Sequence, residues 1–151
     1  MKNLLIAYHS QSGNTQALAS AVAEGSGQES AANIRLKTAF KTDLDDLLWA
    51  HGLLFGTPEN FGTMSGALKD FFDRTFYPAQ PYKLNLPYAI FISAENDGTG
   101  AVREIDRIAL GYPLRKIAEP LIIKGEVSSS DIQAAQDFGL AMAAGMCLGI
   151  Y

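Results

Sequence analysis

Five short apolar segments, each followed by a pattern typical of a helix, set the strongest limit on how this chain can fold. The segments are residues 4–8, 33–37, 53–55, 88–93 and 120–124. Four are almost continuously apolar, as strands covered on both faces are, whereas 33–37 alternates apolar and polar residues and suits an edge strand. This alternation predicts an α/β fold: a doubly wound, five-stranded parallel sheet with right-handed crossovers and helices on both faces.

Helical spacing and capping signals place the intervening helices. Apolar residues at helical spacing predict helices over 16–24, 64–75 and 102–109. Residues 42–46 resemble a capped helix start with acidic residues in the first turn, and they predict a short helix that ends near Trp49. Thr63 or Ser65 can cap the helix over 64–75, and Ser130 with Gln133 resembles a capping box at the start of the last helix. Residues 77–87 contain three prolines and predict a connecting loop.

Three loops are expected at one edge of this sheet. In a doubly wound fold, ligands bind at the carboxyl ends of the strands, beside the point where strand order reverses. Residues 10–15, 57–63 and 94–100 follow the first, third and fourth predicted strands, and they are the loops with unusual chemistry. We therefore expect one site formed by all three.

The first loop is suited to an anion. Its residues are Ser10, Gln11, Ser12, Gly13, Asn14 and Thr15, directly before a predicted helix. Backbone N–H groups at a helix start stabilise negative charge, and the hydroxyls add donors. The loop has no P-loop lysine and no Gly-x-Gly-x-x-Gly, which favours a single phosphate monoester over a triphosphate or dinucleotide. An ordinary capped helix start, the simpler alternative, would need only one such residue.

The other two loops offer room for a flat ligand. In the second loop, Asn60 presents a donor and an acceptor, and Phe61 can offer a ring face, although it could instead pack back as a hydrophobic staple. The third loop is polar and contains glycines that permit close approach of its backbone to a ligand. A solvated turn is the alternative for this third loop.

Composition excludes several classes of protein. A net charge of -4 and no block of basic residues argue against a nucleic-acid or anionic-membrane partner. Cys147 is the single cysteine and His9 and His51 the only histidines, so we expect no disulfide and no metal site. No signal peptide and no apolar run of membrane-spanning length are evident. We expect one cytoplasmic domain over residues 1–151.

Residues 6–15 resemble the FMN phosphate-loop signature of the flavodoxin-like family. Residues 56–66, continuing through 72–75, more closely resemble the FMN-dependent NAD(P)H:quinone reductases first named as Trp-repressor-binding proteins. The resemblance implies a flavodoxin-like fold with FMN as cofactor. It implies that the first loop holds the phosphate, that residues 57–61 line one side of the isoalloxazine, and that residues 93–98 line the other side and the ribityl chain.

The cofactor-binding residues expected on this basis come from all three loops, and no catalytic side chain is expected because the flavin carries the chemistry. They are Ser10, Gln11, Ser12, Gly13, Asn14, Thr15, Thr57, Pro58, Glu59, Asn60, Phe61, Gly62, Ser93, Ala94, Glu95, Asn96, Asp97 and Gly98.

Three functions are compatible with this site. The first is an NAD(P)H-dependent oxidoreductase that reduces a quinone or similar acceptor, and the second is an electron carrier between larger redox partners. The third is a flavin-free binding module, since fold alone does not fix function. Carriers of this family usually have an aromatic residue in the third loop that covers the flavin. The third loop of this chain has no aromatic residue, which favours the reductase. Tyr77 or Tyr82 is a candidate substitute cover.

Overall fold

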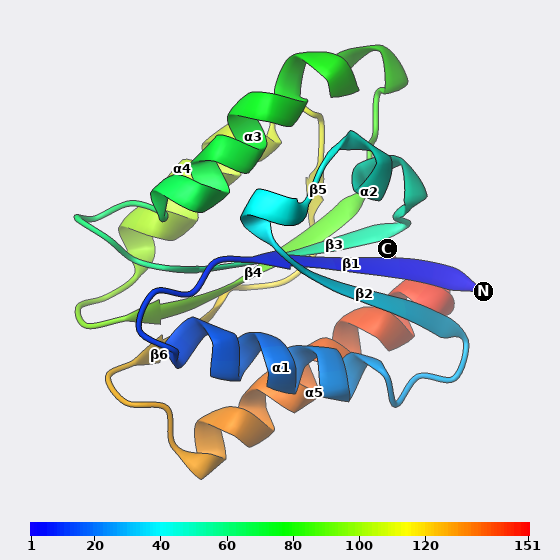
Figure 1. Cartoon of the computed structure of the whole chain (residues 1–151). Helices are drawn as coiled ribbons and strands as arrows, with labels where there is room; N and C mark the ends of the chain where they lie inside the picture. The colour runs from blue at the N-terminus through cyan, green and yellow to red at the C-terminus, as the bar shows by residue number, and fades with distance from the viewer.

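The computed structural model describes the whole chain, residues 1–151, as a parallel sheet between two layers of helices (Figure 1). The strands are β1 (Lys2–Tyr8), β2 (Ala32–Thr38), β3 (Gly52–Pro58), β4 (Pro87–Ala94), β5 (Arg115–Lys116) and β6 (Leu121–Lys124). The helices are α1 (Asn14–Ser26), α2 (Leu44–Trp49), α3 (Gly66–Ala79), α4 (Thr99–Ala109) and α5 (Ser129–Cys147), with 3-10 turns η1 (Ala39–Lys41) and η2 (Gln80–Tyr82).

The strand order is β2-β1-β3-β4-β5, and β6 also pairs with β4, all in parallel. The chain turns outward from β1 to β2 and then crosses to β3 on the other side of β1, so strand order reverses beside β1. This confirms the doubly wound parallel sheet. The edge strand expected over 33–37 is β2, which lies at one edge as predicted.

One strand, residues 120–124, was predicted to follow the fourth, but the structure has two strands at the sheet edge beside β4. Two short strands share it: β5 pairs with Pro87 and Tyr88, and β6 pairs with residues 91–94. The sequence pattern missed β5 because its two residues, Arg115 and Lys116, are charged and exposed. They carry neither an apolar run nor an alternation.

Side chains of the central strands feed two cores in alternation, because successive side chains of a strand point to opposite faces. From β1, Leu5 and Ala7 join the core beneath α3 and α4, whereas Leu4 and Ile6 join the core beneath α1 and α5. This burial on both faces explains why the central strands are almost continuously apolar. None of the helices combines the length and the apolar character needed to cross a membrane.

Two predicted helix boundaries were wrong. Helix α3 continues through Pro78 to Ala79, so the connecting loop is shorter than residues 77–87. A proline is tolerated there because it removes only one hydrogen bond, in the last turn. The N-cap of helix α5 lies two residues earlier than expected. Ser128 and Asp131 form the capping box, instead of Ser130 and Gln133. At the start of α3, Ser65 is the cap.

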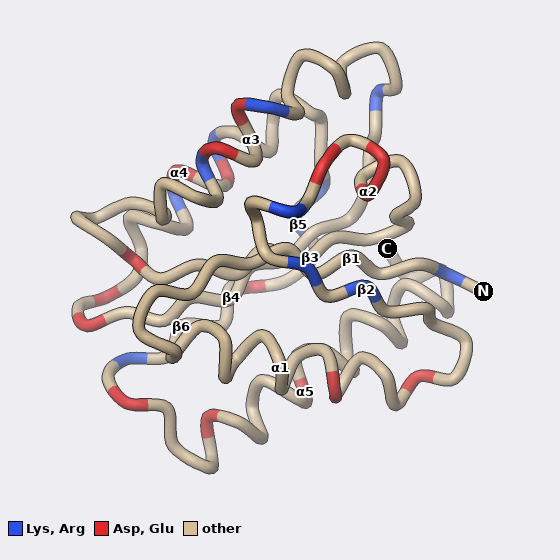
Figure 2. Tube along the Cα trace, viewed as in Figure 1, with Lys and Arg blue, Asp and Glu red and all other residues tan.

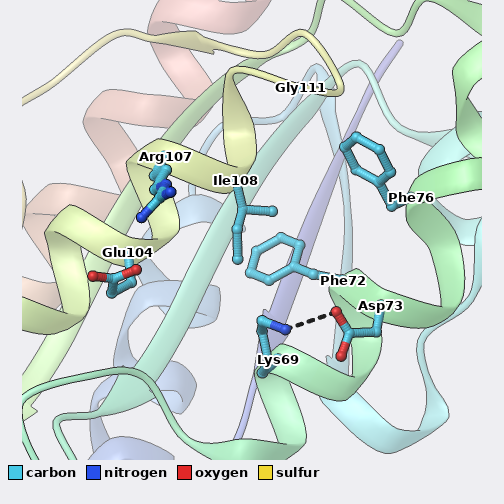
Figure 3. A pocket seen from close by; sticks show the side chains of 8 residues that line it. All are labelled: Lys69, Phe72, Asp73, Phe76, Glu104, Arg107, Ile108 and Gly111. Atoms are coloured by element: carbon cyan, nitrogen blue, oxygen red, sulfur yellow. Dashed lines mark hydrogen bonds and ion pairs between the residues drawn. The ribbon is translucent and has the colours of Figure 1, made fainter.

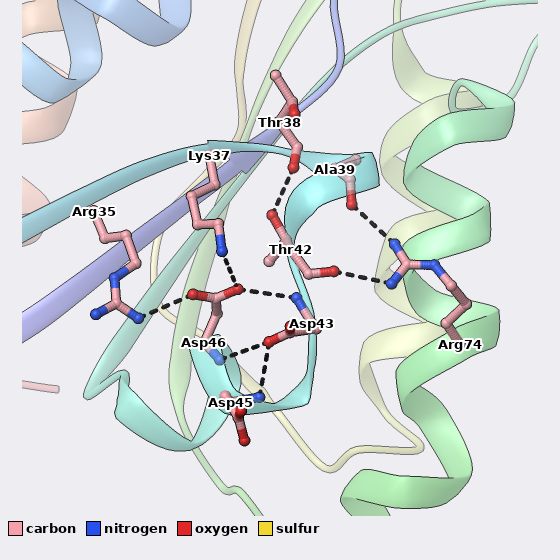
Figure 4. Close-up of polar contacts among 9 residues, drawn as sticks. All are labelled: Arg35, Lys37, Thr38, Ala39, Thr42, Asp43, Asp45, Asp46 and Arg74. Atoms are coloured by element: carbon pink, nitrogen blue, oxygen red, sulfur yellow. Dashed lines mark hydrogen bonds and ion pairs between the residues drawn. The ribbon is translucent and has the colours of Figure 1, made fainter.

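The acidic cluster at the start of α2 has a structural role (Figure 4). Asp43 and Asp46 form a capping box, and Asp46 also pairs with Arg35 at 2.9 Å and Lys37 at 2.8 Å on β2. Burial raises the pKa of the Asp46 carboxyl, but hydrogen bonds from Lys37, the Asp43 N–H and Arg35 outweigh it and leave the pKa below its ordinary value. These contacts fix α2 against the edge of the sheet.

Candidate functional site

The three loops predicted to form one site do lie together at the carboxyl edge of the sheet. They enclose a hollow of about 120 Å³. Its lining residues are Ser12, Asn14, Pro58, Glu59, Asn60, Ser93, Ala94 and Glu95. All eight are among the expected cofactor-binding residues. The other ten, described below, shape the loops around this hollow or lie at its margin.

The first loop wraps around the start of α1. The Ser10 hydroxyl oxygen accepts hydrogen bonds from the N–H groups of Gly13 at 3.2 Å and Gln16 at 3.1 Å. Gly13 has φ of 104°, in the left-handed region that favours glycine, and nothing lies within 4 Å of the position its Cβ would occupy. The Ser10 side chain therefore holds the loop in its folded form, and the space beside Gly13 is open.

Donors remain available in this loop. The following backbone N–H groups donate to no protein acceptor: Gln11, Ser12, Asn14 and Thr15. The Ser10 hydroxyl, which accepts two bonds, keeps its own hydrogen to donate. This donor set, at the positive end of a 13-residue helix, fits a phosphate monoester without a lysine or arginine.

Two buried hydroxyls brace the loops. Thr15 Oγ1 and Ser93 Oγ lie 2.7 Å apart and join the first loop to the end of β4. Thr57 Oγ1 donates to the Pro58 carbonyl and accepts from the Ser65 N–H, and its side chain is fully buried. These contacts give Thr15 and Thr57 positioning roles that their place in the sequence does not reveal.

Glu59 joins the second loop to the third. Its carboxylate accepts hydrogen bonds from the N–H groups of Gly98 at 3.2 Å, Gly100 at 3.1 Å and Ala101 at 3.4 Å. These N–H groups belong to the start of α4, which a carboxylate stabilises through the helix dipole. The sequence placed Glu59 beside the cofactor but gave no sign of this bridge, because its partners are about 40 residues away.

The tip of the second loop is a tight turn that presents an aromatic ring. Asn60 and Thr63 exchange two backbone hydrogen bonds, and Phe61 and Gly62 between them have φ of 53° and 75°. Positive φ at both central positions defines a type I′ turn, which favours Asn and Gly and disfavours bulky residues. The Phe61 side chain is fully exposed, so the hydrophobic-staple alternative is wrong. Asn60 Nδ2 also reaches Gln11 Oε1 at 3.5 Å.

The third loop is ordered by its own hydrogen bonds. Asp97 accepts from the backbone N–H and the hydroxyl of Thr99, and the backbone bond first, then the hydroxyl bond, lower the pKa of its exposed carboxyl. Gly98 has φ of 75°, and a Cβ there would approach Ile122 to 2.8 Å. Asn96 lies exposed beside them.

The three loops carry acidic residues and no basic ones (Figure 2). The groups that the loops themselves offer to an anion are therefore backbone dipoles and hydroxyls.

Tyr77 and Tyr82 do not cover the site. Helix α3 runs back from the carboxyl ends of the strands toward their amino ends (Figure 1). Tyr77 in its last turn and Tyr82 in η2 therefore lie far from the three loops. The suggestion that either tyrosine replaces the missing aromatic of the third loop was wrong. Residues 77–87 were expected to form a loop, but α3 continues through Pro78 to Ala79. This extension places both tyrosines away from the three-loop site.

The fold and the loop site define a flavodoxin-like protein. An archaeal flavodoxin superposes with a TM-score of 0.81 at 21% identity, covering 95% of this chain and 98% of that one. A WrbA-like flavodoxin from Agrobacterium tumefaciens gives 0.80 at 22% identity, covering 97% and 98%.

The chain belongs to the family described as NADPH-dependent FMN reductase, whose profile matches residues 3–113. This membership makes it a flavodoxin-like, FMN-binding redox protein, as the sequence resemblance implied.

Two curated relatives carry different names. A protein named flavodoxin from Aquifex aeolicus (strain VF5) is 40% identical over 73 residues, which are 48% of this chain and 40% of the relative. A protein named NAD(P)H dehydrogenase (quinone) from Acidithiobacillus ferrooxidans (strain ATCC 53993 / BNL-5-31) is 34% identical over 95 residues, 50% of this chain and 48% of the relative. The chain spans less than half the length of both.

Proposed function

We propose that this protein uses FMN at the three-loop site to pass electrons from NAD(P)H to a quinone or a similar acceptor. The observation that carries the proposal is the exposed Phe61 ring at the tip of the second loop, opposite a third loop without any aromatic residue. A site of this kind leaves one face of a flat cofactor accessible to a second flat molecule. A nicotinamide and a quinone are both such molecules.

In this proposal the first loop anchors the phosphate through the N–H groups of Gln11, Ser12, Asn14 and Thr15 and through the Ser10 hydroxyl. The hollow lined by the second and third loops receives the ring system, and Glu59 keeps those two loops together. Bound FMN supplies the two-electron chemistry, so no acid or base side chain is required. The net reaction is NAD(P)H + H⁺ + quinone → NAD(P)⁺ + hydroquinone.

Electron transfer to a protein partner is the second candidate. The observation that favours it is the acidic character of the loops, which carry Glu59, Glu95 and Asp97 and no lysine or arginine. Basic side chains come from neighbouring segments: besides its hydrogen bonds, Lys124 and Arg103 help to lower the pKa of the Asp97 carboxyl. Acidic surface around a redox site would attract a basic partner and speed its association at low salt. The two candidates share the cofactor and differ in whether NAD(P)H is used. A cytoplasmic location and a single domain over residues 1–151 are part of the same proposal.

Steady-state turnover tests the reductase. The FMN-loaded protein is mixed with NADPH or NADH and a simple soluble benzoquinone, and nucleotide oxidation is followed at substoichiometric enzyme. We expect many turnovers per protein with at least one nucleotide. A carrier would give no catalytic consumption of either nucleotide, although it would accept electrons from a chemical reductant.

A further inference from the structure

The largest hollows of the molecule lie beside the three-loop site, in a groove between α3 and α4. Two adjoining hollows of about 450 and 490 Å³ share Lys69, Glu104 and Ile108 in their lining. The first extends toward Phe76 and Gly111, and the second extends toward Asn60 and Phe61. Together they form what we call the α3/α4 groove.

The floor of the α3/α4 groove is apolar. Figure 3 shows Phe72 of α3 and Ile108 of α4 facing each other across it, with Phe76 farther along. Met64 lies under the end nearest the loops. From Gly66 to Phe76 the groove follows α3 for about 15 Å, at the rise of an α-helix. The far end is fixed by Tyr112, whose hydroxyl donates to the Phe72 carbonyl and whose pKa burial raises to about 12.

The rims of the groove are polar but electrically balanced. Lys69 pairs with Asp73 on its own helix at 2.8 Å, and Glu104 and Arg107 stand on the opposite rim. No side-chain hydrogen bond or ion pair joins α3 to α4, so the groove is not closed by its own residues. A dinucleotide, which carries several negative charges, would find no excess of positive charge here.

The groove is continuous with the candidate site. Asn60 lines both the hollow among the three loops and the near end of the groove. At the same point a Cβ on Gly100 would come within 2.0 Å of the Gly62 carbonyl oxygen, so the second loop contacts the start of α4 directly. A molecule whose head lay beside Phe61 could therefore extend an attached chain along the groove.

We propose that the α3/α4 groove binds the isoprenoid side chain of a quinone acceptor whose ring lies beside Phe61, against the exposed face of the FMN bound among the three loops. This inference rests on the proposed reductase function and specifies its substrate as a prenylated quinone. The apolar floor matches a hydrocarbon chain, the balanced rims match an uncharged one, and the opening at Phe61 matches its point of attachment. Burial of two methylenes on such a floor strengthens binding about tenfold.

Gly66 allows the groove to be filled without disturbing the fold. It lines the groove at the first turn of α3, and nothing lies within 4 Å of the position its Cβ would occupy. Gly66→Leu places a bulky side chain in the groove, and Gly66→Ala is the matched control, since both replacements have a much higher helix propensity than glycine. Ile108→Gln, on the opposite wall, is a second variant that makes the floor polar.

The test compares a short prenylated benzoquinone with the same benzoquinone lacking the chain. Calorimetric affinity for the FMN-loaded protein without nucleotide, and KM in turnover, are both measured. We expect the wild-type protein to bind the prenylated quinone about tenfold more tightly, as burial of two or more methylenes implies. Gly66→Leu and Ile108→Gln should abolish that preference, whereas Gly66→Ala should keep it.

Equal affinity of the wild-type protein for the two quinones would overturn the inference. So would equal losses for both quinones in Gly66→Leu, or a change in oligomeric state on gel filtration that showed the groove to be covered by a second copy. Failure of the reductase function would look different. In that case no nucleotide would be consumed with either quinone, while the calorimetric preference would still decide the role of the groove.

Discussion

Thr15 and Ser93 are 78 residues apart in the chain, yet their buried hydroxyl oxygens lie 2.7 Å apart where the first loop meets the end of β4. The contact ties the helix start that offers anion donors to the strand that leads into the third loop. A buried hydroxyl left without a partner costs free energy, so each residue depends on the other. The candidate site is thereby braced from below, by groups that need not touch the ligand.

A double-mutant cycle measures this coupling. We expect Thr15→Val and Ser93→Ala each to lower the free energy of unfolding by about 1–3 kcal/mol, because each leaves one hydroxyl unpaired. The double variant should cost less than the sum of the two, since no orphaned group remains. Urea denaturation of the FMN-free protein gives all three values. Strict additivity would show that the two hydroxyls do not interact.

Ser12→Glu tests the phosphate position. Ser12 is exposed, so the substitution should fold normally, whereas Thr15 is buried and a glutamate there would also damage the core. Like-charge repulsion at about 4 Å costs about 4 kcal/mol at an effective dielectric constant of 20, enough to weaken FMN binding by a hundredfold or more. Flavin fluorescence quenching provides the affinity.

Riboflavin, which lacks the phosphate, is the matched control for Ser12→Glu. Its affinity should change little, because the repulsion acts only on the phosphate. Equal losses for FMN and riboflavin would instead mean that Ser12 contacts the ring or the ribityl chain.

Phe61→Asn should separate stability from function. Asparagine tolerates the left-handed conformation at φ of 53° better than phenylalanine, and no packing is lost because the ring is fully exposed. We expect the free energy of unfolding to rise by about 1 kcal/mol while quinone reduction falls. Denaturant unfolding and turnover provide the two measurements. A stabilised variant with unchanged turnover would show that the Phe61 ring has no role in quinone reduction.

Glu59→Gln should loosen the second and third loops. A carboxylate accepting three N–H groups binds them more strongly than a neutral amide, and hydrogen bonds to charged groups contribute about 1.5–3 kcal/mol. We expect faster amide hydrogen exchange at Gly98 and Gly100, with FMN bound more weakly. Exchange at those amides that matched the wild-type protein would contradict the bridge.

Asp46→Asn should flatten the acid limb of the stability curve. The pKa of the Asp46 carboxyl is below its ordinary value of 3.8 in the folded protein, so its contribution is present above that value. It is lost as the pH falls through the lower, folded pKa. We expect the variant to be less stable by about 2 kcal/mol at pH 7, and the difference to shrink below pH 4. A pH-independent difference would exclude ionisation as the cause.

The sequence was sufficient to predict the sheet and the place of the site. Residues 4–8 and 88–93 show burial on both faces directly, and parallel strands bring their carboxyl ends to one edge. The meeting of the three loops therefore followed from topology alone. Strand β5 was missed because its two charged residues form no apolar pattern. The end of α3 was placed too early because Pro78 suggested a loop.

Side-chain partners could not be predicted in the same way. Glu59 accepts from the start of α4, and Thr57 bonds to the Pro58 carbonyl and the Ser65 N–H, because of how the loops fold in space. The exposure of Phe61 depends on the positive φ values of its turn, and phenylalanine at such a position runs against the usual preference. The α3/α4 groove likewise depends on the spacing of two helices that are distant in the sequence.

Anaerobic reduction of bound FMN by a nicotinamide nucleotide distinguishes a reductase from an electron carrier. FMN-loaded protein is mixed with NADPH, and separately with NADH, in a stopped-flow instrument while the flavin absorbance near its visible maximum is recorded. We expect at least one nucleotide to bleach the bound FMN at a rate no slower than steady-state turnover. FMN that stays oxidised with both nucleotides, but is bleached by dithionite, would contradict the reductase and leave the carrier.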